Sequence, residues 1–192
     1  VAAGARAGDV AIVHNVITSA QVPEVIAATG ARAVRTRVGH SFIKAEMARH
    51  DAVFGGEHSA HYYFRDFWFA DTGMLAAMHT LAALGEQPEP LSTVMADFQR
   101  YVASGEINST VPDAGAATER VRAWALPQRV EVDELDGLTL THAGDPDRAD
   151  DPMWWLNLRA SNTEPLLRLN VEAAKPDRMA SLRDEVLAIV RG

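Results

Sequence analysis

The chain has 192 residues, of which 47% are hydrophobic, and its formal net charge of −8 at pH 7 argues against nucleic-acid binding, because a phosphate backbone requires a basic protein face. It has no cysteine, which excludes disulfides and thiolate metal sites. The absence of cysteine fits a cytoplasmic protein, and because no apolar run reaches the roughly 18 residues that a membrane-spanning helix needs, we expect no membrane partner.

The first part of the chain alternates between strand and helix patterns. Strands are predicted at residues 10–17, 32–38 and 52–54. Helices are predicted at residues 23–30, 41–49 and 71–84, with Ser41 and Asp71 as the N-caps of the second and third. This order predicts an α/β domain over residues 1–100, in which helices are layered on a mainly parallel sheet. Ligands of such sheets bind at the carboxyl ends of strands, where the loops at Gly39-His40 and residues 55–61 fall.

A turn-rich stretch begins at Gly85, and we place the domain boundary near Tyr101. Strands are then predicted at residues 129–133, 138–142, 153–159 and 166–173. Helices are predicted at residues 92–102, at residues 113–126 with Asp113 as N-cap, and from Pro176 onward. Residues 104–115 are predicted to be a break, with a hinge at Ser104-Gly105. Without a regular strand-helix alternation, residues 101–192 predict a smaller α+β domain, a sheet with helices on one face.

The loop GGEHSAH at residues 55–61 contains the residue types that bind a sugar. Glu57 can accept hydrogen bonds from two neighbouring hydroxyl groups, and Ser59 can donate or accept one. Two glycines allow the backbone to approach a ligand closely. The alternative is that Glu57 is a surface carboxylate, but the composition favours binding. His58 is expected to pack as a half-buried ring against the aromatic residues that follow.

Other polar residues lie near this loop. His40 and Lys44 follow a strand end and are candidates to face a substrate and its phosphate ester, although Lys44 also fits a solvated helix face. His61 is a further candidate for substrate binding. His58 and His61 do not have the spacing of the helical zinc motifs, so we predict no metal site in this chain.

The loop RASNTEP at residues 159–165 joins two predicted strands. Arg159 at the strand end can supply a bidentate fork, and Ser161, Asn162 and Thr163 with their backbone N–H groups can surround phosphate oxygens. An ordinary connecting turn explains the same residues about as well. The residues alone leave both interpretations open.

These motifs resemble those of a known family, the α-D-phosphohexomutases. GEHSAH is similar to the family's sugar-binding loop, usually GEMSGH, and RASNTEP is similar to its phosphate-binding signature. VGHSFIK at residues 38–44 resembles the segment that precedes the sugar loop. The motifs occur in the family's order, and the resemblance covers essentially the whole chain. It implies the third and fourth of the family's four domains, in particular those of bacterial phosphomannomutase/phosphoglucomutase enzymes.

The resemblance implies an activity for the intact protein, an isomerase of carbohydrate metabolism. A phosphohexomutase interconverts hexose 6-phosphate and hexose 1-phosphate through a phosphoserine and a 1,6-bisphosphate intermediate. Glu57, Ser59 and His40 would bind the sugar. The phosphate would be bound by Arg159, Ser161, Asn162 and Thr163. Mannose and glucose preference stays open, because no residue is assigned to the 2-hydroxyl group.

The chain contains no run like the family's phosphoserine loop or its aspartate-rich magnesium loop. The resemblance therefore implies that the catalytic serine, Mg²⁺ and a glucose 1,6-bisphosphate-type activator belong to the intact enzyme. No catalytic residue and no bound cofactor are expected in this chain, and the two N-terminal domains are its expected partners. We expect the chain alone to be inactive. The alternative is a stand-alone sugar-phosphate-binding or regulatory module without catalysis.

The sequence departs from the family's pattern at three positions. His58 replaces a common methionine and Ala60 a common glycine, which should affect loop packing more than chemistry. Ile17 stands near the place of a substrate-contacting lysine in many members. One substrate contact of the family is therefore not expected here.

Overall fold

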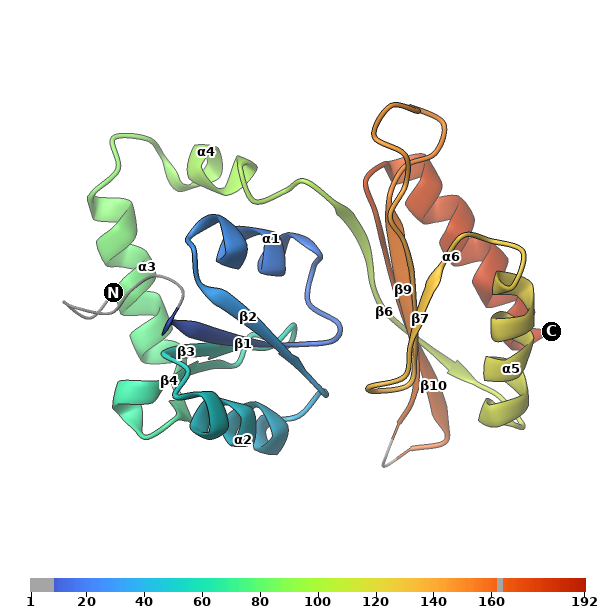
Figure 1. The fold of residues 1–192 in the computed structure, drawn as a ribbon, viewed down its shortest axis with the longest axis horizontal. Helices are drawn as coiled ribbons and strands as arrows, with labels where there is room; N and C mark the ends of the chain where they lie inside the picture. Colours follow the sequence, from blue (N-terminus) through green and yellow to red (C-terminus); the bar gives the residue numbers. More distant parts are fainter. Residues whose placement is uncertain (1–8, 162–163) are drawn as a thin grey trace. The chain divides into compact units, whose positions relative to one another are not determined.

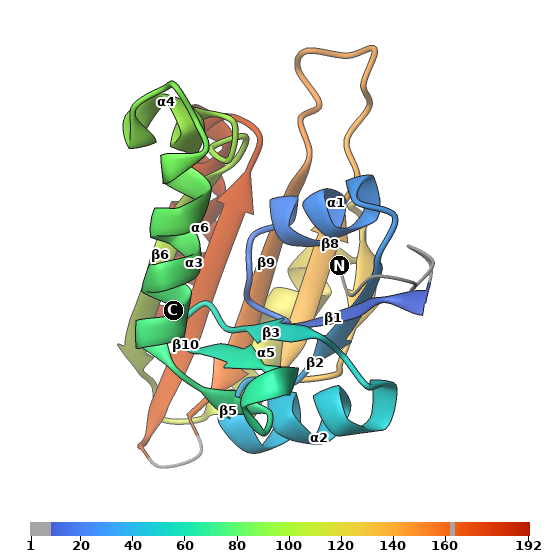
Figure 2. The same cartoon turned by 90° about the vertical axis from the view of Figure 1, so that its left-hand side faces the viewer.

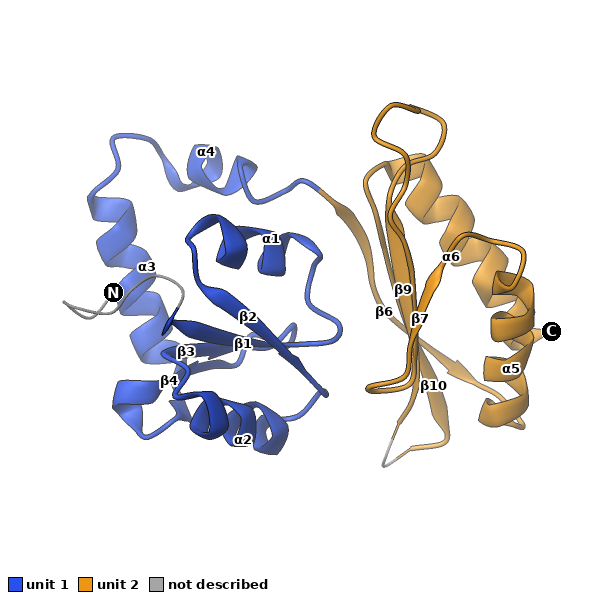
Figure 3. Ribbon diagram, in the orientation of Figure 1, with its two compact units in different colours: residues 1–100 blue, residues 101–192 orange. Residues whose placement is uncertain are grey.

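A computed structural model of the protein describes residues 9–161 and 164–192. The chain divides into two compact units, Val1–Arg100 and Tyr101–Gly192, which Figure 3 colours separately. Each unit has its own five-stranded sheet. Within the described ranges, no helix has the length and apolar character needed to cross a membrane.

The sheet of the first unit is mixed, with the strand order β2-β1-β3-β4-β5. Its strands are β1 (Ala11–Asn15), β2 (Arg32–Thr36), β3 (Phe54–Gly56), β4 (Tyr62–Phe64) and β5 (Ala70–Asp71). Strand β1 lies parallel to β2 and β3, whereas β4 and β5 are added antiparallel. The α/β class predicted for this part is confirmed. The antiparallel strands come from the aromatic stretch after the GEHSAH loop, where aromatic side chains favour a pleated, half-buried surface.

Helices α1 (Gln21–Ala28) and α2 (His40–His50) lie on opposite faces of this sheet (Figures 1 and 2). Ile43 and Met47 of α2 are fully buried in a core with strand residues such as Val13. Gly55 permits this packing, because a Cβ atom there would lie 2.8 Å from the Met47 sulfur. Two further helices of the first unit, α3 (Gly73–Gly85) and α4 (Leu91–Ala96), follow the 3-10 turn η2 (Arg65–Phe67).

Two predicted N-caps in this unit are wrong. Gly39, with φ +131°, is the N-cap residue of α2, and no side-chain hydrogen bond caps the helix there, so Ser41 lies inside it. Helix α3 is capped by Thr72, whose hydroxyl accepts a hydrogen bond from the Leu75 N–H at 3.3 Å. Asp71 belongs to β5 instead, because its backbone pairs with Tyr63. Helix α3 has no buried residue.

The second unit is an antiparallel sheet with helices on one face (Figure 1). Its strands, in the order β6-β10-β9-β8-β7, are β6 (Val102–Thr110), β7 (Glu131–Asp133), β8 (Leu138–His142), β9 (Trp154–Ala160) and β10 (Leu166–Ala173). Helices α5 (Ala114–Ala125) and α6 (Pro176–Arg191) cover a core that contains Leu156, Leu158, Leu167 and Leu169. The predicted α+β class is confirmed, and Asp113 caps α5 by accepting from the Ala116 N–H at 2.9 Å.

The predicted break at residues 104–115 is partly wrong, because strand β6 runs through its first half. The ladder with β10 shifts register between Asn170 and Glu172, near Gly105, which has φ +70°. At this bulge the Ser104 hydroxyl accepts a hydrogen bond from the Val171 N–H at 3.0 Å, in place of a backbone carbonyl oxygen of β6. A mainly polar edge strand lacks the apolar alternation that makes a strand visible in a sequence.

Two glycines with similar backbone angles test how much steric contact adds to strain. Gly137 has φ +76°, and a Cβ atom there would lie 2.5 Å from the Leu158 carbonyl oxygen, whereas Gly105 at φ +70° has no neighbour within 4 Å. Gly105→Ala should lower the free energy of unfolding by about 1 to 2 kcal/mol, the cost of the left-handed conformation. Gly137→Ala should cost about 3 kcal/mol or more because the backbone must also move.

Urea denaturation of both variants, followed by circular dichroism, measures the difference. Equal losses of stability in the two variants would contradict the close approach of the segment around Gly137 to Arg159.

Candidate functional site

Glu57 is placed where three strands of the first unit end. It follows β3 directly, and β1 and β2 run parallel to β3 in the same sheet, so their carboxyl ends share one edge. The Glu57 N–H donates to the His61 carbonyl oxygen at 3.0 Å and closes the β3–β4 hairpin. The side chain is only 7% exposed, so this is not the surface carboxylate of the alternative interpretation.

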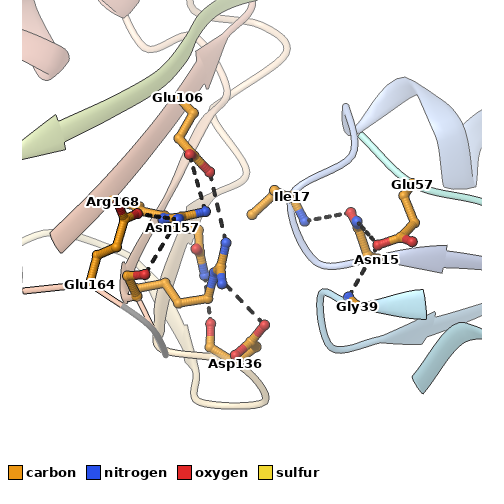
Figure 4. Close-up of polar contacts among 11 residues, drawn as sticks. Asn15, Ile17, Gly39, Glu57, Glu106, Asp136, Asn157, Glu164 and Arg168 are labelled. Atoms are coloured by element: carbon orange, nitrogen blue, oxygen red, sulfur yellow. Dashed lines mark hydrogen bonds and ion pairs between the residues drawn. The ribbon is translucent and has the colours of Figure 1, made fainter. Parts of the chain in front are cut away.

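The Glu57 carboxylate is held by groups from three separate segments, of which Figure 4 shows the two at Asn15 and Gly39. The Tyr63 hydroxyl donates to Oε1 at 2.5 Å. The Gly39 N–H and the Asn15 Nδ2 donate to Oε2 at 3.1 Å and 3.4 Å. Burial, and then the hydrogen bond to the carboxylate, raise the pKa of Tyr63, which therefore remains a proton donor.

The bonds to Glu57 limit what the carboxylate can still accept. A carboxylate has about four lone-pair sites, and internal donors occupy three of them. One hydroxyl group of a ligand can be added directly. A second requires that an internal donor be exchanged, and the longest of the three bonds, from Asn15, is the one that costs least to replace.

The other residues predicted for this site lie around Glu57 on exposed surface. Ser59 is in the hairpin turn two residues after Glu57, and His40 follows Gly39, the residue that binds Glu57. Lys44 is exposed one helical turn after His40 on α2. His61 Nδ1 lies 3.0 Å from Asp71 Oδ2 in an exposed pair.

The hairpin turn differs in two ways from what the sequence suggests. His58 is exposed in the turn, so its expected packing as a half-buried ring is wrong. Ala60 has φ +64°, a conformation that glycine adopts without a steric cost.

A cavity of about 430 Å³ opens beside Glu57, between α1 and the sheet. His14 lines it and is only 5% exposed. Its Nδ1 is 2.8 Å from the Thr18 hydroxyl and 3.1 Å from the Asn15 carbonyl oxygen. Burial lowers the pKa of His14, and the positive charge of Arg35 acts in the same direction, so the neutral ring is favoured here.

In the second unit, Arg159 is paired with an arginine that was not predicted as a site residue. Arg159 on β9 lies directly opposite Arg168 on β10, so both side chains are on the same face of the sheet. This face lies opposite the one that α5 and α6 cover, because side chains alternate along each strand with the core leucines. The Arg168 Nη2 donates to the Ser161 hydroxyl at 3.3 Å. Asn162 and Thr163 lie outside the described residues.

Carboxylates surround the two guanidinium groups (Figure 4). Glu106 on β6 bridges them, with Oε2 3.8 Å from Arg159 Nη2 and Oε1 3.4 Å from Arg168 Nη1. Asp136 Oδ2 is 3.9 Å from Arg159 Nε, and Glu164 Oε2 is 3.5 Å from Arg168 Nη2. Two positive groups thus face three negative ones, and the cluster has a formal net charge of −1.

This polar face retains unused hydrogen-bonding groups. Within residues 9–161 and 164–192, the buried side-chain atoms without a hydrogen-bond partner are Asn157 Oδ1, Arg159 Nε, Arg168 Nε and Asn170 Nδ2. All four side chains lie on the same face of β9 and β10, because Asn157 pairs with Asn170 and Arg159 with Arg168. Buried polar atoms normally find partners, so these atoms indicate a place for a polar ligand.

Sequence reasoning missed four supporting residues: Asn15, Tyr63, Glu106 and Arg168. Asn15 had a signal, since a polar side chain directly after the apolar strand β1 marks a strand end. The other three depend on strand pairing and had no local signal. The described part of the chain contains no group of three or more His, Cys, Asp or Glu side chains that could hold a metal ion.

The hydroxyl group of Tyr63 should be essential to this arrangement. Tyr63→Phe removes a donor from a buried carboxylate and should lower the free energy of unfolding by about 1.5 to 3 kcal/mol. The neighbouring Tyr62 is 36% exposed, so Tyr62→Phe should change stability by less than about 0.5 kcal/mol. Chemical denaturation of both variants measures this, and equal effects would show that the bond to Glu57 adds no stability.

Comparisons with known proteins agree on one family. The family model described as "Phosphoglucomutase/phosphomannomutase, alpha/beta/alpha domain III" matches residues 1–101, and "Phosphoglucomutase/phosphomannomutase, C-terminal domain" matches residues 106–189. A phosphomannomutase of Escherichia coli is 36% identical over 182 residues, which are 94% of this chain. The chain spans only 38% of that relative's length.

Solved structures have the same fold. A phosphoglucomutase/phosphomannomutase family protein of Burkholderia thailandensis superposes with a TM-score of 0.77 at 23% identity, over 95% of this chain and 37% of that one. An N-acetylphosphoglucosamine mutase of Aspergillus fumigatus, in complex with GlcNAc-6P and magnesium, has a TM-score of 0.65 at 12% identity, over 96% of this chain and 42% of that one. At these identities the likeness shows the fold alone.

Proposed function

Because this chain belongs to the phosphoglucomutase/phosphomannomutase family, the α-D-phosphohexomutases, we propose that it is the substrate-binding half of a phosphohexomutase. The proposed reaction interconverts hexose 6-phosphate and hexose 1-phosphate, of mannose or glucose, through a phosphoserine and a 1,6-bisphosphate intermediate. The observation that carries the proposal is the Glu57 carboxylate, which hydrogen-bond donors from three segments hold at the strand ends. It lies in a chain that the family's two domain models match over residues 1–101 and 106–189.

In this proposal Glu57 accepts a hydrogen bond from a sugar hydroxyl. Ser59 and His40 bind the ring from the exposed segments on either side, with Lys44 and His61 as further candidates. The carboxylate does not have to be ordered when substrate arrives, because internal donors already hold it in place. Such preorganisation reduces the entropy lost on binding and favours one orientation of the ring.

The phosphate group is proposed to bind at Arg159 and Ser161, where Arg168 now joins them. Two guanidinium groups side by side can form bidentate hydrogen bonds with phosphate oxygens. Asn162 and Thr163 remain part of the proposed phosphate site. The site orients the substrate and supplies no group that reacts.

Magnesium and the reacting serine are proposed to belong to the intact enzyme, as is a glucose 1,6-bisphosphate-type activator. The Aspergillus relative named above is a complex with magnesium, which supports a metal in the family. The residues that the structure describes here do not fit such a site, and no step through a metal is derived from them. A cytoplasmic location also stays a prediction.

Substitution of the two binding residues tests the assignment in the intact protein. Glu57→Ala and Arg159→Ala should each lower kcat/KM at least about tenfold, equal to about 1.4 kcal/mol of transition-state binding. Arg183→Ala is the matched control, because Arg183 lies on α6 and forms an ion pair with its chain neighbour Asp184. Steady-state assays on mannose 6-phosphate and glucose 6-phosphate give the values. If neither substitution lowers turnover more than the control does, the site is assigned wrongly.

The purified 192-residue chain should bind hexose phosphate but not convert it, because the reacting groups are proposed to lie elsewhere in the enzyme. A coupled mutase assay with Escherichia coli phosphomannomutase as the positive control measures this. Conversion by the chain alone would contradict the proposed division of roles.

A further inference from the structure

We propose that Glu106 is an internal counter-anion that occupies the arginine pair until the phosphate group of a substrate displaces it, and that it sets the affinity of the pair for phosphate. The inference rests on the proposed function, which assigns phosphate to Arg159 and Arg168. It adds a residue from the edge strand β6, far from RASNTEP in the sequence.

The geometry of Glu106 resembles that of a bridging phosphate. Each of its oxygens faces a different guanidinium group, at 3.8 Å for Arg159 and 3.4 Å for Arg168. A phosphate group presents oxygens to two arginines in the same manner, with more charge and more acceptor sites. Both distances are longer than a close charge-assisted hydrogen bond, so the carboxylate compensates the pair without saturating it.

The charge of the cluster requires a displacement. With a formal net charge of −1 among the arginines and their carboxylates, a phosphate dianion would meet repulsion at short range if every carboxylate stayed in place. The unpartnered buried Nε atoms of Arg159 and Arg168 show that both guanidinium groups still have donors to offer. A ligand can therefore gain hydrogen bonds as it takes the place of a carboxylate.

Glu106 is the carboxylate best suited to move. Asp136 is more enclosed, with a side chain only 10% exposed, so its carboxylate has less room to turn toward solvent. Glu164 is 57% exposed, so water already screens its charge. The side chain of Glu106, on an edge strand, is 28% exposed. It is shielded enough for its charge to affect the arginines and open enough to rotate toward solvent.

Such an exchange suits a site that must bind and release phosphate in every turnover. Arg159 is buried and Arg168 is half-buried, so their positive charges are costly to leave uncompensated, and Glu106 faces both of them whenever the phosphate leaves. Its presence also weakens phosphate binding, because the ligand must compete with it. The affinity for phosphate is thereby kept moderate, and release is faster than from an uncompensated arginine pair.

Titration calorimetry of the purified chain with inorganic phosphate and with glucose 6-phosphate tests the proposal. Glu106→Gln keeps the size of the side chain and removes its charge, so Kd should fall at least about fivefold. Glu106→Asp keeps the charge but moves it away from the arginines, so Kd should fall by less than in Glu106→Gln. The matched control is Glu172→Gln, which removes a charge from the same face where Glu172 accepts from Trp155 Nε1 at 2.6 Å.

Each outcome decides a separate point. Tighter binding in both Glu106 variants with Glu172→Gln unchanged supports the exchange. Unchanged or weaker binding in them, or equal tightening in Glu172→Gln, overturns it. Arg159→Ala separates this result from the proposed function. If the Arg159→Ala variant binds phosphate as tightly as the unsubstituted chain, the phosphate site itself is wrong. If Arg159→Ala abolishes binding but the Glu106 variants have no effect, only the exchange is overturned. Thermal unfolding confirms that each variant is folded.

Discussion

The first unit depends on one buried carboxylate. A charged group that is 7% exposed is stable only where hydrogen bonds replace the lost water, and Glu57 obtains them from Tyr63, Gly39 and Asn15. These donors lie in three segments, so the same bonds that compensate the charge also hold the ends of the strands together. The hairpin turn that carries Ser59 is aligned with the start of α2 as a consequence.

The second unit separates its apolar and polar functions by the two-residue period of its strands. Leu156 and Leu158 face the helices, whereas Asn157 and Arg159, which alternate with them along β9, face the opposite side. The sheet therefore has a packed core on one face and a dense polar surface on the other. Charges on that surface are compensated by their neighbours, but several of its buried donors and acceptors are left for a ligand.

Local sequence signals predicted much of this architecture, and they failed where tertiary contacts determined a helix cap or a strand. Asp113 was predictable as an N-cap, since a cap depends only on the next few residues. Thr72 replaced Asp71 as a cap because pairing with Tyr63 draws Asp71 into β5. Strand β6 was missed because its polar residues are held by β10 and not by an apolar pattern.

The sequence by itself determined the two fold classes, the apolar faces of the main elements, and the motifs that contain Glu57 and Arg159. These properties follow from residues that are near one another along the chain. Only the tertiary structure decided which donors hold Glu57, and that Arg168 and Glu106 accompany Arg159. Strand register brings such residues together across long sequence separations, and a shift by one position would turn each side chain to the other face of the sheet.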